Sequence, residues 1–503
     1  MSKHQFTEER IAIDENNPAI MRHEQLCIKC GACKRVCEKE IAVGRLYELK
    51  NTDDTPICVH CGQCANVCPT DSITERYEYP DVKKAIADPD KIVIFNTSPS
   101  VRVSIGEAFG KQGSFLQGEM VAALRKLGAD YVLDTNFAAD LTITEEASEL
   151  VDRIVNKTKP LPQFTSCCPA WVKFVETFFP ALTPHVSSAK SPIGMQGPTV
   201  KSYFAKKTGI DPKCIVNVAV TPCTAKKFEI RRDEMCDASK EIGISDMMDM
   251  DHVITARELI KWIKEEGINF TDLEESGYDK LMGEASGSGV IFGNTGGVME
   301  AAARSAYYYV TGKNPGEDFL KLEAVRGMDK VRIATVDIAG TPVRVAVTHG
   351  LDNAKKLLED FVAGKDDFDF LEVMSCRGGC IGGGGQPKTV IPMDDTVRKA
   401  RIDALYDKDS NMPLRFSHDN PDIIAAYDEQ YEKPLSHIAE RMLHTSYYSR
   451  SSDLGPTGAT ERPIPDTAYR CNICKYVHPG EIPDGYVCPK CGVPKSLFTL
   501  MDE

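Results

Sequence analysis

Long apolar runs and clusters of basic residues are both missing from this sequence of 503 residues. No stretch of eighteen consecutive apolar residues occurs, although a helix that crosses a membrane needs about that many. Residues 1–16 are polar and carry neither an apolar core nor a twin-arginine signal, so we expect a cytoplasmic protein without a membrane partner. The formal net charge is -14 and no basic stripe is present, which argues against binding to nucleic acid.

Nucleotide-binding glycine patterns are missing as well. Neither a GxGxxG motif nor a phosphate loop occurs, so we expect no nucleotide site. The sequence is instead rich in cysteine, with 19 in all, mostly in tight groups. Grouped cysteines favour metal ligation in a reducing compartment over the dispersed disulfides of a secreted scaffold. With 42% hydrophobic residues, the chain can also fill at least one large core.

Two runs of four cysteines near the amino terminus share the spacing C-x2-C-x2-C-x3-C. They consist of Cys27, Cys30, Cys33 and Cys37, and of Cys58, Cys61, Cys64 and Cys68. This spacing is typical of bacterial ferredoxins, in which three thiolates of a run bind one 4Fe-4S cluster and the fourth binds the other. The alternative, a pair of zinc knuckles, usually shows pairs of cysteines or Cys/His mixtures. The pattern therefore predicts two 4Fe-4S clusters.

Beyond residue 80, short apolar runs alternate with helical patterns. The runs comprise residues 92–95, 214–220, 289–292 and 368–374, and each ends directly before a polar or glycine-rich motif. We expect them to be buried strands of an α/β domain. Because sites of α/β proteins form at the carboxyl ends of strands, the motifs should converge at one place.

Three cysteine segments follow such runs or lie between them. They are residues 165–171, 221–229 and 372–387, and they supply Cys168, Cys223, Cys376 and Cys380. Four thiolates suit a buried iron-sulfur cube, although each segment taken alone is also compatible with an ordinary cluster or a zinc ion. The glycines at 378–379 and 382–385 remove side chains where the backbone approaches a bulky group.

These three segments resemble the active-site signatures of the FeFe hydrogenases, and the resemblance extends from about residue 20 to residue 447. It implies an H-cluster, in which a cube and a di-iron unit with carbon monoxide and cyanide ligands share one cysteine, here Cys380. It further implies that Lys226 donates a hydrogen bond to one cyanide. The remaining contacts implied for the di-iron unit come from Ser98, Pro99, Ser100, Phe292 and Met374.

The resemblance also implies a proton path that begins at the non-ligand cysteine Cys167. Its further members are Glu146, Glu149, Arg153 and a serine at Ser187 or Ser188. The sequence supports part of this path independently, because positions 146, 149 and 153 have the i, i+3, i+7 spacing of one helix face. The alternative is a solvated charged helix. A thiol beside a cluster can carry protons because its pKa lies within reach of neutrality.

Two positions depart from the family pattern. Thr221 stands where methionine is usual, and Ile193 stands where we expect glutamine. Both substitutions alter the polarity around the cofactor, which tunes its potential. They resemble a divergent subgroup of the family.

The carboxyl-terminal part contains three further regions. Residues 398–448 resemble the small-subunit region of the family, and residues 449–466 have the composition of a linker. Beyond it, four cysteines in a rubredoxin-like pattern predict a mononuclear iron site, with zinc as the alternative: Cys471, Cys474, Cys488 and Cys491. Tyr469 and Phe498 are expected to pack around this site.

Taken together, the sequence predicts an α/β catalytic domain with an α+β ferredoxin-like domain and a small rubredoxin-like domain. The expected boundaries are 1–85, 86–448, a linker at 449–466, and 467–503. The predicted function is interconversion of H2 with protons and electrons, exchanged with ferredoxin, rubredoxin or another electron carrier. Dedicated maturation enzymes are implied by the resemblance. The alternatives are a hydrogen-sensing homologue with slow turnover and a non-catalytic iron-sulfur assembly protein.

Overall fold

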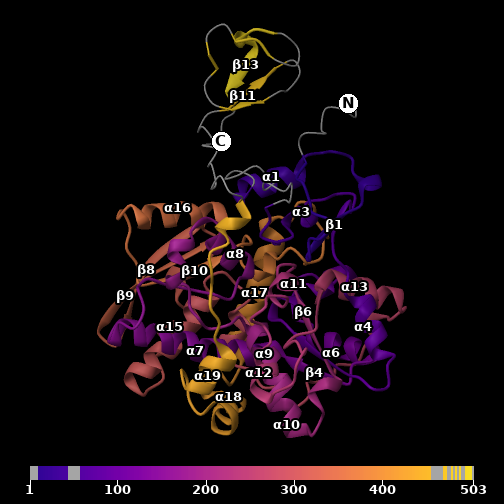
Figure 1. Ribbon diagram of the computed structural model, residues 1–503, viewed down its shortest axis with the longest axis vertical. Coiled ribbons are helices and arrows are strands. Elements are labelled where there is room, and N and C mark those ends of the chain that lie inside the picture. Colours follow the sequence, from indigo (N-terminus) through magenta and orange to yellow (C-terminus); the bar gives the residue numbers. More distant parts are fainter. Residues whose placement is uncertain are drawn as a thin grey trace.

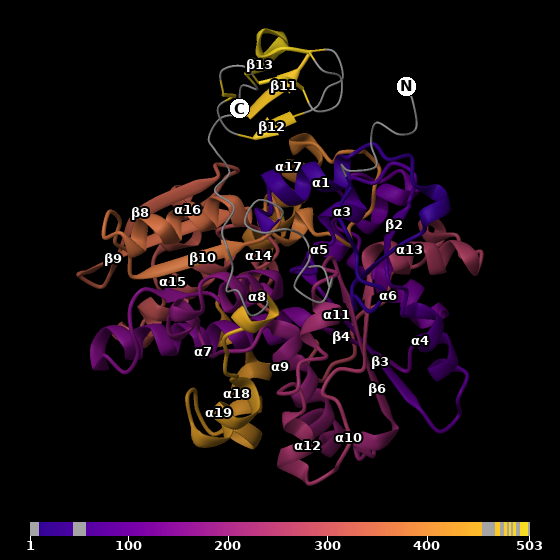
Figure 2. The same cartoon turned by 45° about the horizontal axis from the view of Figure 1, so that its top comes forward.

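The fold is known from a computed structural model. It describes residues 10–43, 57–454, 468–472, 477–479, 482–483, 486–488 and 493–500. Two four-stranded sheets lie on opposite sides of the main body, with α8 (Pro169–Phe178) between them (Figures 1 and 2). Among the described residues, none of the helices has the length and apolar character that a membrane crossing requires.

The first sheet is entirely parallel, with the strand order β4-β3-β6-β7. Its strands are β3 (Ile92–Thr97), β4 (Tyr131–Asp134), β6 (Ile215–Thr221) and β7 (His252–Thr255). Val93 and Phe95 pack into one core cluster while Ile94 packs into another, so both faces of β3 are buried. Burial on both faces explains why these strands are apolar runs without polar alternation.

Helices cover this sheet on both faces. On one face lie α4 (Tyr79–Ile86), α6 (Gln117–Lys126) and α13 (Ala256–Glu265), whose apolar residues share a core with Val93 and Phe95. On the other lie α7 (Thr135–Asn156), α9 (Pro192–Thr199) and α19 (His437–Leu443). Helices α10 (Ala205–Thr208) and α12 (Asp237–Ile242) contribute to the same core, while α5 (Pro99–Arg102) follows β3 and α11 (Lys226–Glu229) follows β6.

The second sheet is mixed, with the order β5-β10-β9-β8. Its strands are β5 (Gln163–Phe164), β8 (Val331–Ile338), β9 (Thr341–His349) and β10 (Phe370–Met374), and only the pair β8–β9 is antiparallel. The other helices of this half are α15 (Gly297–Thr311), α16 (Leu351–Val362), α17 (Asp395–Asn411) and α18 (Pro421–Ala426). The predicted α/β architecture is confirmed.

One of the four predicted strands is wrong. Residues 289–292 contribute instead to helix α14 (Gly287–Ile291), which Ser286 caps by accepting a hydrogen bond from the Gly289 amide at 3.3 Å. A Cβ on Gly289 would lie 2.7 Å from the carbonyl oxygen of Asn136, so glycine lets this helix pack closely on α7. Short apolar runs do not distinguish a buried helix from a buried strand, which is the reason for the error.

The amino-terminal region packs on the main body above the two sheets in Figure 2. It contains the antiparallel pair β1 (Ile20–Arg22) and β2 (Ile73–Glu75) and the helices α1 (Ala32–Lys39) and α3 (Gln63–Asn66). Two strands and two short helices around the cysteine runs are the α+β arrangement that the ferredoxin-like spacing predicts.

The carboxyl-terminal tail forms a separate three-stranded antiparallel sheet (Figure 1). Its strands are β11 (Ala468–Cys471), β12 (Val477–Pro479) and β13 (Phe498–Leu500). The start of the predicted linker is not free, because Arg450 donates a 2.8 Å hydrogen bond to Glu176 and residues 451–454 form a 3-10 turn. Residues 455–467 lie outside the described residues.

Candidate active site

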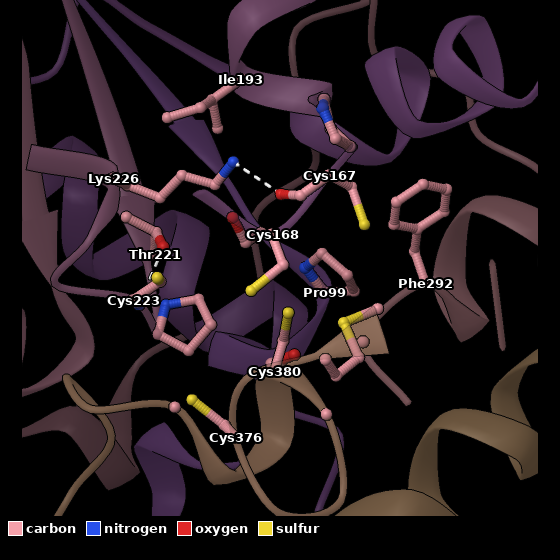
Figure 3. A pocket seen from close by; sticks show the side chains of 18 of the residues that line it. Pro99, Cys167, Cys168, Ile193, Thr221, Cys223, Lys226, Phe292, Cys376 and Cys380 are labelled. Carbon is pink, nitrogen blue, oxygen red and sulfur yellow. Dashed lines mark hydrogen bonds between the residues drawn. The ribbon is translucent and has the colours of Figure 1, made fainter. Parts of the chain in front are cut away.

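Five cysteines line a buried cavity of about 70 Å³ between the two sheets. They are Cys167, Cys168, Cys223, Cys376 and Cys380, and Figure 3 shows the thiols of the last four gathered around one space. Their segments are separated by up to about two hundred residues in sequence, as the sequence analysis anticipates. The predicted convergence of the three cysteine segments is therefore present in the structure.

Strand ends position these cysteines. Cys168 follows β5 and is the N-cap residue of α8, with Pro169 in the first turn. Cys223 follows β6, and its amide donates a 3.0 Å hydrogen bond to the hydroxyl of Thr221. Cys376 follows β10, so each of the three loops leaves the carboxyl end of a strand, where α/β sites form.

Glycine is required where the last cysteine loop turns. Gly379 has φ +94°, and a Cβ there would lie 2.6 Å from the amide nitrogen of Thr295. A Cβ on Gly383 would lie 2.3 Å from the carbonyl oxygen of Pro222. Side chains at these two positions would displace the loop that carries Cys380.

Lys226 contacts the cavity from α11. Its ammonium donates hydrogen bonds to the carbonyl oxygen of Cys167 at 3.1 Å, drawn in Figure 3, and to Glu229 at 2.7 Å. Burial opposes the charge, but Glu229 and Cys223 hold the pKa of Lys226 above its ordinary value. A fixed buried ammonium at the cavity wall is suited to hold an anionic ligand.

The other predicted contact residues all line the same cavity: Ser98, Pro99, Ser100, Phe292 and Met374. Within the described part of the chain, the Ser100 hydroxyl is buried and has no hydrogen-bond partner. The divergent residues Thr221 and Ile193 are also part of the lining, so they set its polarity directly. Clustered thiols, a buried ammonium and an unpaired hydroxyl around one space fit an H-cluster with its cyanide ligands.

Three residues of the predicted proton path lie on α7, in agreement with their helical spacing. Glu146 is fully buried, and neither of its carboxylate oxygens has a hydrogen-bond partner among the described residues. Burial, followed by the negative charge of Glu149, raises the pKa of Glu146 to about 8. Glu146 therefore carries a proton at neutral pH.

Glu149 has the opposite environment. Although burial opposes ionisation, Arg153 and Lys159 lower the pKa of Glu149 to about 2. Ser187 donates a 2.6 Å hydrogen bond to this carboxylate, and the hydroxyl of Ser188 lies farther away at 3.4 Å. Of the two candidate serines, Ser187 thus makes the closer contact.

The environment of Cys167 corrects one assumption of the sequence analysis. Burial, the largest cause, raises the pKa of the Cys167 thiol well above its ordinary value. The group is consequently a thiol at neutral pH, and its pKa is not close to neutral pH, as the sequence analysis had assumed. Figure 3 shows its sulfur on the side of Phe292.

Comparison with known proteins identifies the family. The family described as "Iron only hydrogenase large subunit, C-terminal domain" matches residues 91–384, "Iron hydrogenase small subunit" matches residues 395–450, and "4Fe-4S dicluster domain" matches residues 26–73. The chain belongs to the FeFe hydrogenase family.

Individual relatives agree with this. The NADP-reducing hydrogenase subunit HndD of Solidesulfovibrio fructosivorans is 42% identical over 86% of this chain and 75% of its own length. The periplasmic Fe hydrogenase large subunit of Nitratidesulfovibrio vulgaris is 47% identical over 72% of this chain and 85% of its own. A solved structure of an FeFe-hydrogenase variant from Chlamydomonas reinhardtii matches with a TM-score of 0.65 and 41% identity, over 74% of this chain and 98% of that one. The cytosolic iron-sulfur assembly component 3 of Bos taurus is more distant, at 29% identity over 73% of this chain and 76% of its own.

The FeFe-hydrogenase fold and the dicluster domain support iron-sulfur clusters and an H-cluster in this chain. In the ferredoxin-like region, one small cavity is lined by Cys27, Cys30, Cys33 and Cys68, which combines three thiols of the first run with the last of the second. Around the other group, burial followed by Cys58 and Cys37 raises the pKa of the Cys64 thiol. Cys61 has Cys64 and Cys37 as neighbours in the same way. This crossed arrangement is the one predicted from the spacing.

Two of the four predicted cysteine ligands of the tail lie within the described residues. Cys471 and Cys488 are buried, whereas Cys474 and Cys491 lie outside the described residues. Phe498 is the register partner of Cys471, and its ring meets that of Tyr486 at 5.8 Å. Tyr469 is partly buried on the same strand as Cys471.

Sequence reasoning missed three contacts of the site. Glu229 pairs with Lys226, and the i, i+3 spacing of the two was the available signal. The hydroxyl of Ser375 lies 3.2 Å from the sulfur of Cys168. Lys159 donates to both Glu149 and Ser188 at 2.8 Å, and as one of two lysines near the end of α7 it carried no signal.

Proposed function

We propose that this member of the FeFe hydrogenase family interconverts H2 with two protons and two electrons. The observation that carries the proposal is the cavity lined by five cysteines, Lys226 and residues 98–100, next to the buried carboxyl group of Glu146. Cys168, Cys223, Cys376 and Cys380 would hold the H-cluster, with Cys380 as the shared ligand. When bound, this group supplies the metal coordination that activates hydrogen and stores electrons.

The chain's own residues would move the protons. Cys167 holds a proton on its sulfur at the cavity wall, and Glu146 holds one on its carboxyl behind it. Ser187 is hydrogen-bonded to Glu149, and Arg153 donates to the same carboxylate and to the backbone carbonyl groups of residues 160 and 185. Lys159, whose side chain is 43% exposed, would connect this end of the path with solvent.

The electrons would pass through two 4Fe-4S clusters in the ferredoxin-like region. Support comes from the close fit of this region to the active-site loop, because a Cβ on Gly384 would lie 2.0 Å from the carbonyl oxygen of Cys61. Such a fit holds the ligand loops of neighbouring clusters close together. Ferredoxin, rubredoxin or another carrier is the proposed partner, and the tail is proposed to hold a mononuclear iron, or zinc, as a further electron port.

The location of the protein and the assembly of its cofactor are also part of the proposal. It includes a cytoplasmic location, although one relative is named as periplasmic, and maturation enzymes that deliver the di-iron unit. The same site would also suit a slow hydrogen sensor, which differs in turnover alone. The distant likeness to an assembly component raises the alternative of a protein without a di-iron unit. The complete set of Cys167, Lys226 and residues 98–100 around one cavity argues against that alternative.

Two measurements on fully matured protein test the proposal in sequence. Infrared bands of bound carbon monoxide and cyanide should be present, and their absence would favour the assembly protein. Hydrogen turnover with reduced ferredoxin, rubredoxin and an artificial dye should then lie at enzymatic rates, on the order of 1–10³ per second. If the infrared bands are present but turnover lies far below this range with every donor, the proposed enzymatic function would be contradicted and the sensor favoured.

A further inference from the structure

A side chain of the ferredoxin-like region reaches the proposed H-cluster pocket. Gln63, in α3, donates one amide hydrogen to the sulfur of Cys376 at 3.1 Å and the other to the carbonyl oxygen of Gly382 at 2.9 Å. Its side chain comes from a region more than three hundred residues away in the sequence, and Gln63 is only 6% exposed. A buried amide of the ferredoxin-like region therefore contacts the sulfur of a cysteine in the active-site loop.

The orientation of this amide is determined by its surroundings. Asn66 donates to the Gln63 carbonyl oxygen at 3.3 Å and to the carbonyl oxygen of Gly383 at 3.0 Å. Asn66 in turn accepts a 2.7 Å hydrogen bond from Arg257, whose guanidinium pairs with Glu75 at 2.8 Å. Because the Gln63 oxygen faces a donor and its nitrogen faces an acceptor, the nitrogen is the atom directed at the Cys376 sulfur.

Backbone packing prevents this contact from loosening. Gly62, next to Gln63, has φ +71°, and a Cβ there would lie 2.3 Å from the hydroxyl oxygen of Thr224. The same hydroxyl donates a 2.7 Å hydrogen bond to the carbonyl oxygen of His60. The loop that carries Gln63 is thus seated directly on the loop that follows Cys223.

A hydrogen bond to a cysteine sulfur that binds iron stabilises negative charge on the cluster. Reduction adds one negative charge, so the hydrogen bond stabilises the reduced form more than the oxidised form and raises the reduction potential. Gln63 lies between Cys61 and Cys64, which belong to the proposed neighbouring cluster. It is therefore placed to adjust the potential of one cluster relative to the next.

We propose that Gln63 is a positioning residue whose amide raises the reduction potential of the iron-sulfur cube bound by Cys376, so that this cube accepts electrons from the ferredoxin-like cluster beside it. This inference rests on the proposed function only in assuming that Cys168, Cys223, Cys376 and Cys380 bind a cube.

The test is an EPR-monitored redox titration of the full-length protein, loaded with iron-sulfur clusters but without the di-iron unit. The signal of the cube is assigned by its loss in Cys223→Ala. Gln63→Met preserves size while removing the donor, and we expect the equilibrium constant for reduction of the cube to fall about tenfold. A tenfold change corresponds to about 59 mV toward more negative potential for one electron.

Gln386→Met is the matched control. Gln386 is buried beside the same cysteine loop, but its amide donates to the carbonyl oxygens of Ser100 and Cys380, at 3.2 and 3.4 Å, rather than to a sulfur. This variant should leave the potential of the cube unchanged. An unchanged potential in Gln63→Met, or an equal shift in both variants, would overturn the proposal.

A second measurement avoids dependence on the folding of the variant. In wild-type protein labelled with ¹⁵N in the glutamine side chains, pulsed EPR of the reduced cube should detect one coupled amide nitrogen. Absence of this coupling overturns the proposal whether or not Gln63→Met folds. Because neither measurement uses hydrogen turnover, an inactive protein that shows the coupling and the shift would sink the proposed enzyme activity and leave the role of Gln63 intact.

Discussion

Arg153 donates a 2.7 Å hydrogen bond to Glu149, one helical turn before it on α7. This contact, with that of Lys159, makes Glu149 a carboxylate at any functional pH, whereas Glu146 on the preceding turn keeps its proton. The two carboxyl groups of the proposed path thus have opposite protonation states at neutral pH. A proton that leaves Glu146 therefore meets a carboxylate that is already ionised.

Replacing Glu149 by glutamine removes the negative charge that contributes to the high pKa of Glu146. We expect the infrared carboxyl band of Glu146 to titrate at lower pH than in the wild type, yet above the ordinary glutamate value of about 4.3, since burial is the larger cause. Hydrogen turnover should decrease by about a hundredfold. Asp152→Asn on the same helix is the control, and an equal effect there would contradict the assignment.

Replacing Lys159 by methionine removes one of the two cations beside Glu149. The pKa of Glu149 should rise from about 2, because Arg153 then stabilises the carboxylate alone. The folded-state stabilisation of this carboxylate is present above the ordinary glutamate pKa and is lost as the pH falls through its folded value. In the variant, Glu149 becomes protonated at a higher pH, and we expect the acid limb of the turnover profile to move to higher pH with it. Lys157→Met, in the same segment, should leave the acid limb in place.

The buried proton of Glu146 makes stability depend on pH in the opposite direction. Its folded pKa of about 8 exceeds the unfolded value of about 4.3, so the native state binds one more proton between these values. The free energy of unfolding should accordingly decrease as the pH rises through this window, by at most about 1.4 kcal/mol per pH unit from this group. Denaturant titrations of Glu146→Gln and wild type at pH 6 and pH 8 measure the difference. Parallel pH dependence in the two proteins would count against a neutral Glu146.

Replacing Cys167 by alanine should leave the iron content unchanged and abolish most hydrogen turnover, since it removes a proton carrier and no cluster ligand. Iron analysis and EPR check the first part, and a turnover assay checks the second. Cys214→Ala, which alters a cysteine outside all the groups above, should retain both. If Cys167→Ala lost the cube while Cys168→Ala kept it, the two roles would have to be exchanged.

Deleting residues 467–503 should leave dye-driven hydrogen turnover nearly intact, because the residues that line the catalytic cavity lie within residues 98–383. Electron exchange with a natural carrier should become slower, since the tail is proposed to be an additional electron port. The isolated tail should show the visible absorption of a ferric tetrathiolate after iron reconstitution. Unchanged rates with every natural carrier would exclude the port.

Spacing alone determined the parts of this protein that depend on local geometry. The helical spacing of Glu146, Glu149 and Arg153 placed them together on α7, and the two cysteine runs specified the exchange of Cys37 and Cys68 between two groups. Three of four apolar runs became the strands β3, β6 and β10. Residues 289–292 were assigned wrongly, because a run of four apolar residues has no period long enough to separate helix from strand.

The cysteine motifs also determined the family and the convergence of their segments, since the metal chemistry requires ligand types and spacings that a sequence displays directly. Proton affinities and long-range contacts were decided by the tertiary structure alone. The same residue type has a pKa of about 8 at Glu146 and about 2 at Glu149, because the first is buried with no hydrogen-bond partner for its carboxylate among the described residues and the second lies between Arg153 and Lys159. Likewise, Gln63 meets Cys376 only because the ferredoxin-like region packs on the active-site loop. Desolvation and contacts across three hundred residues depend on what surrounds a side chain in space, and sequence order does not contain that information.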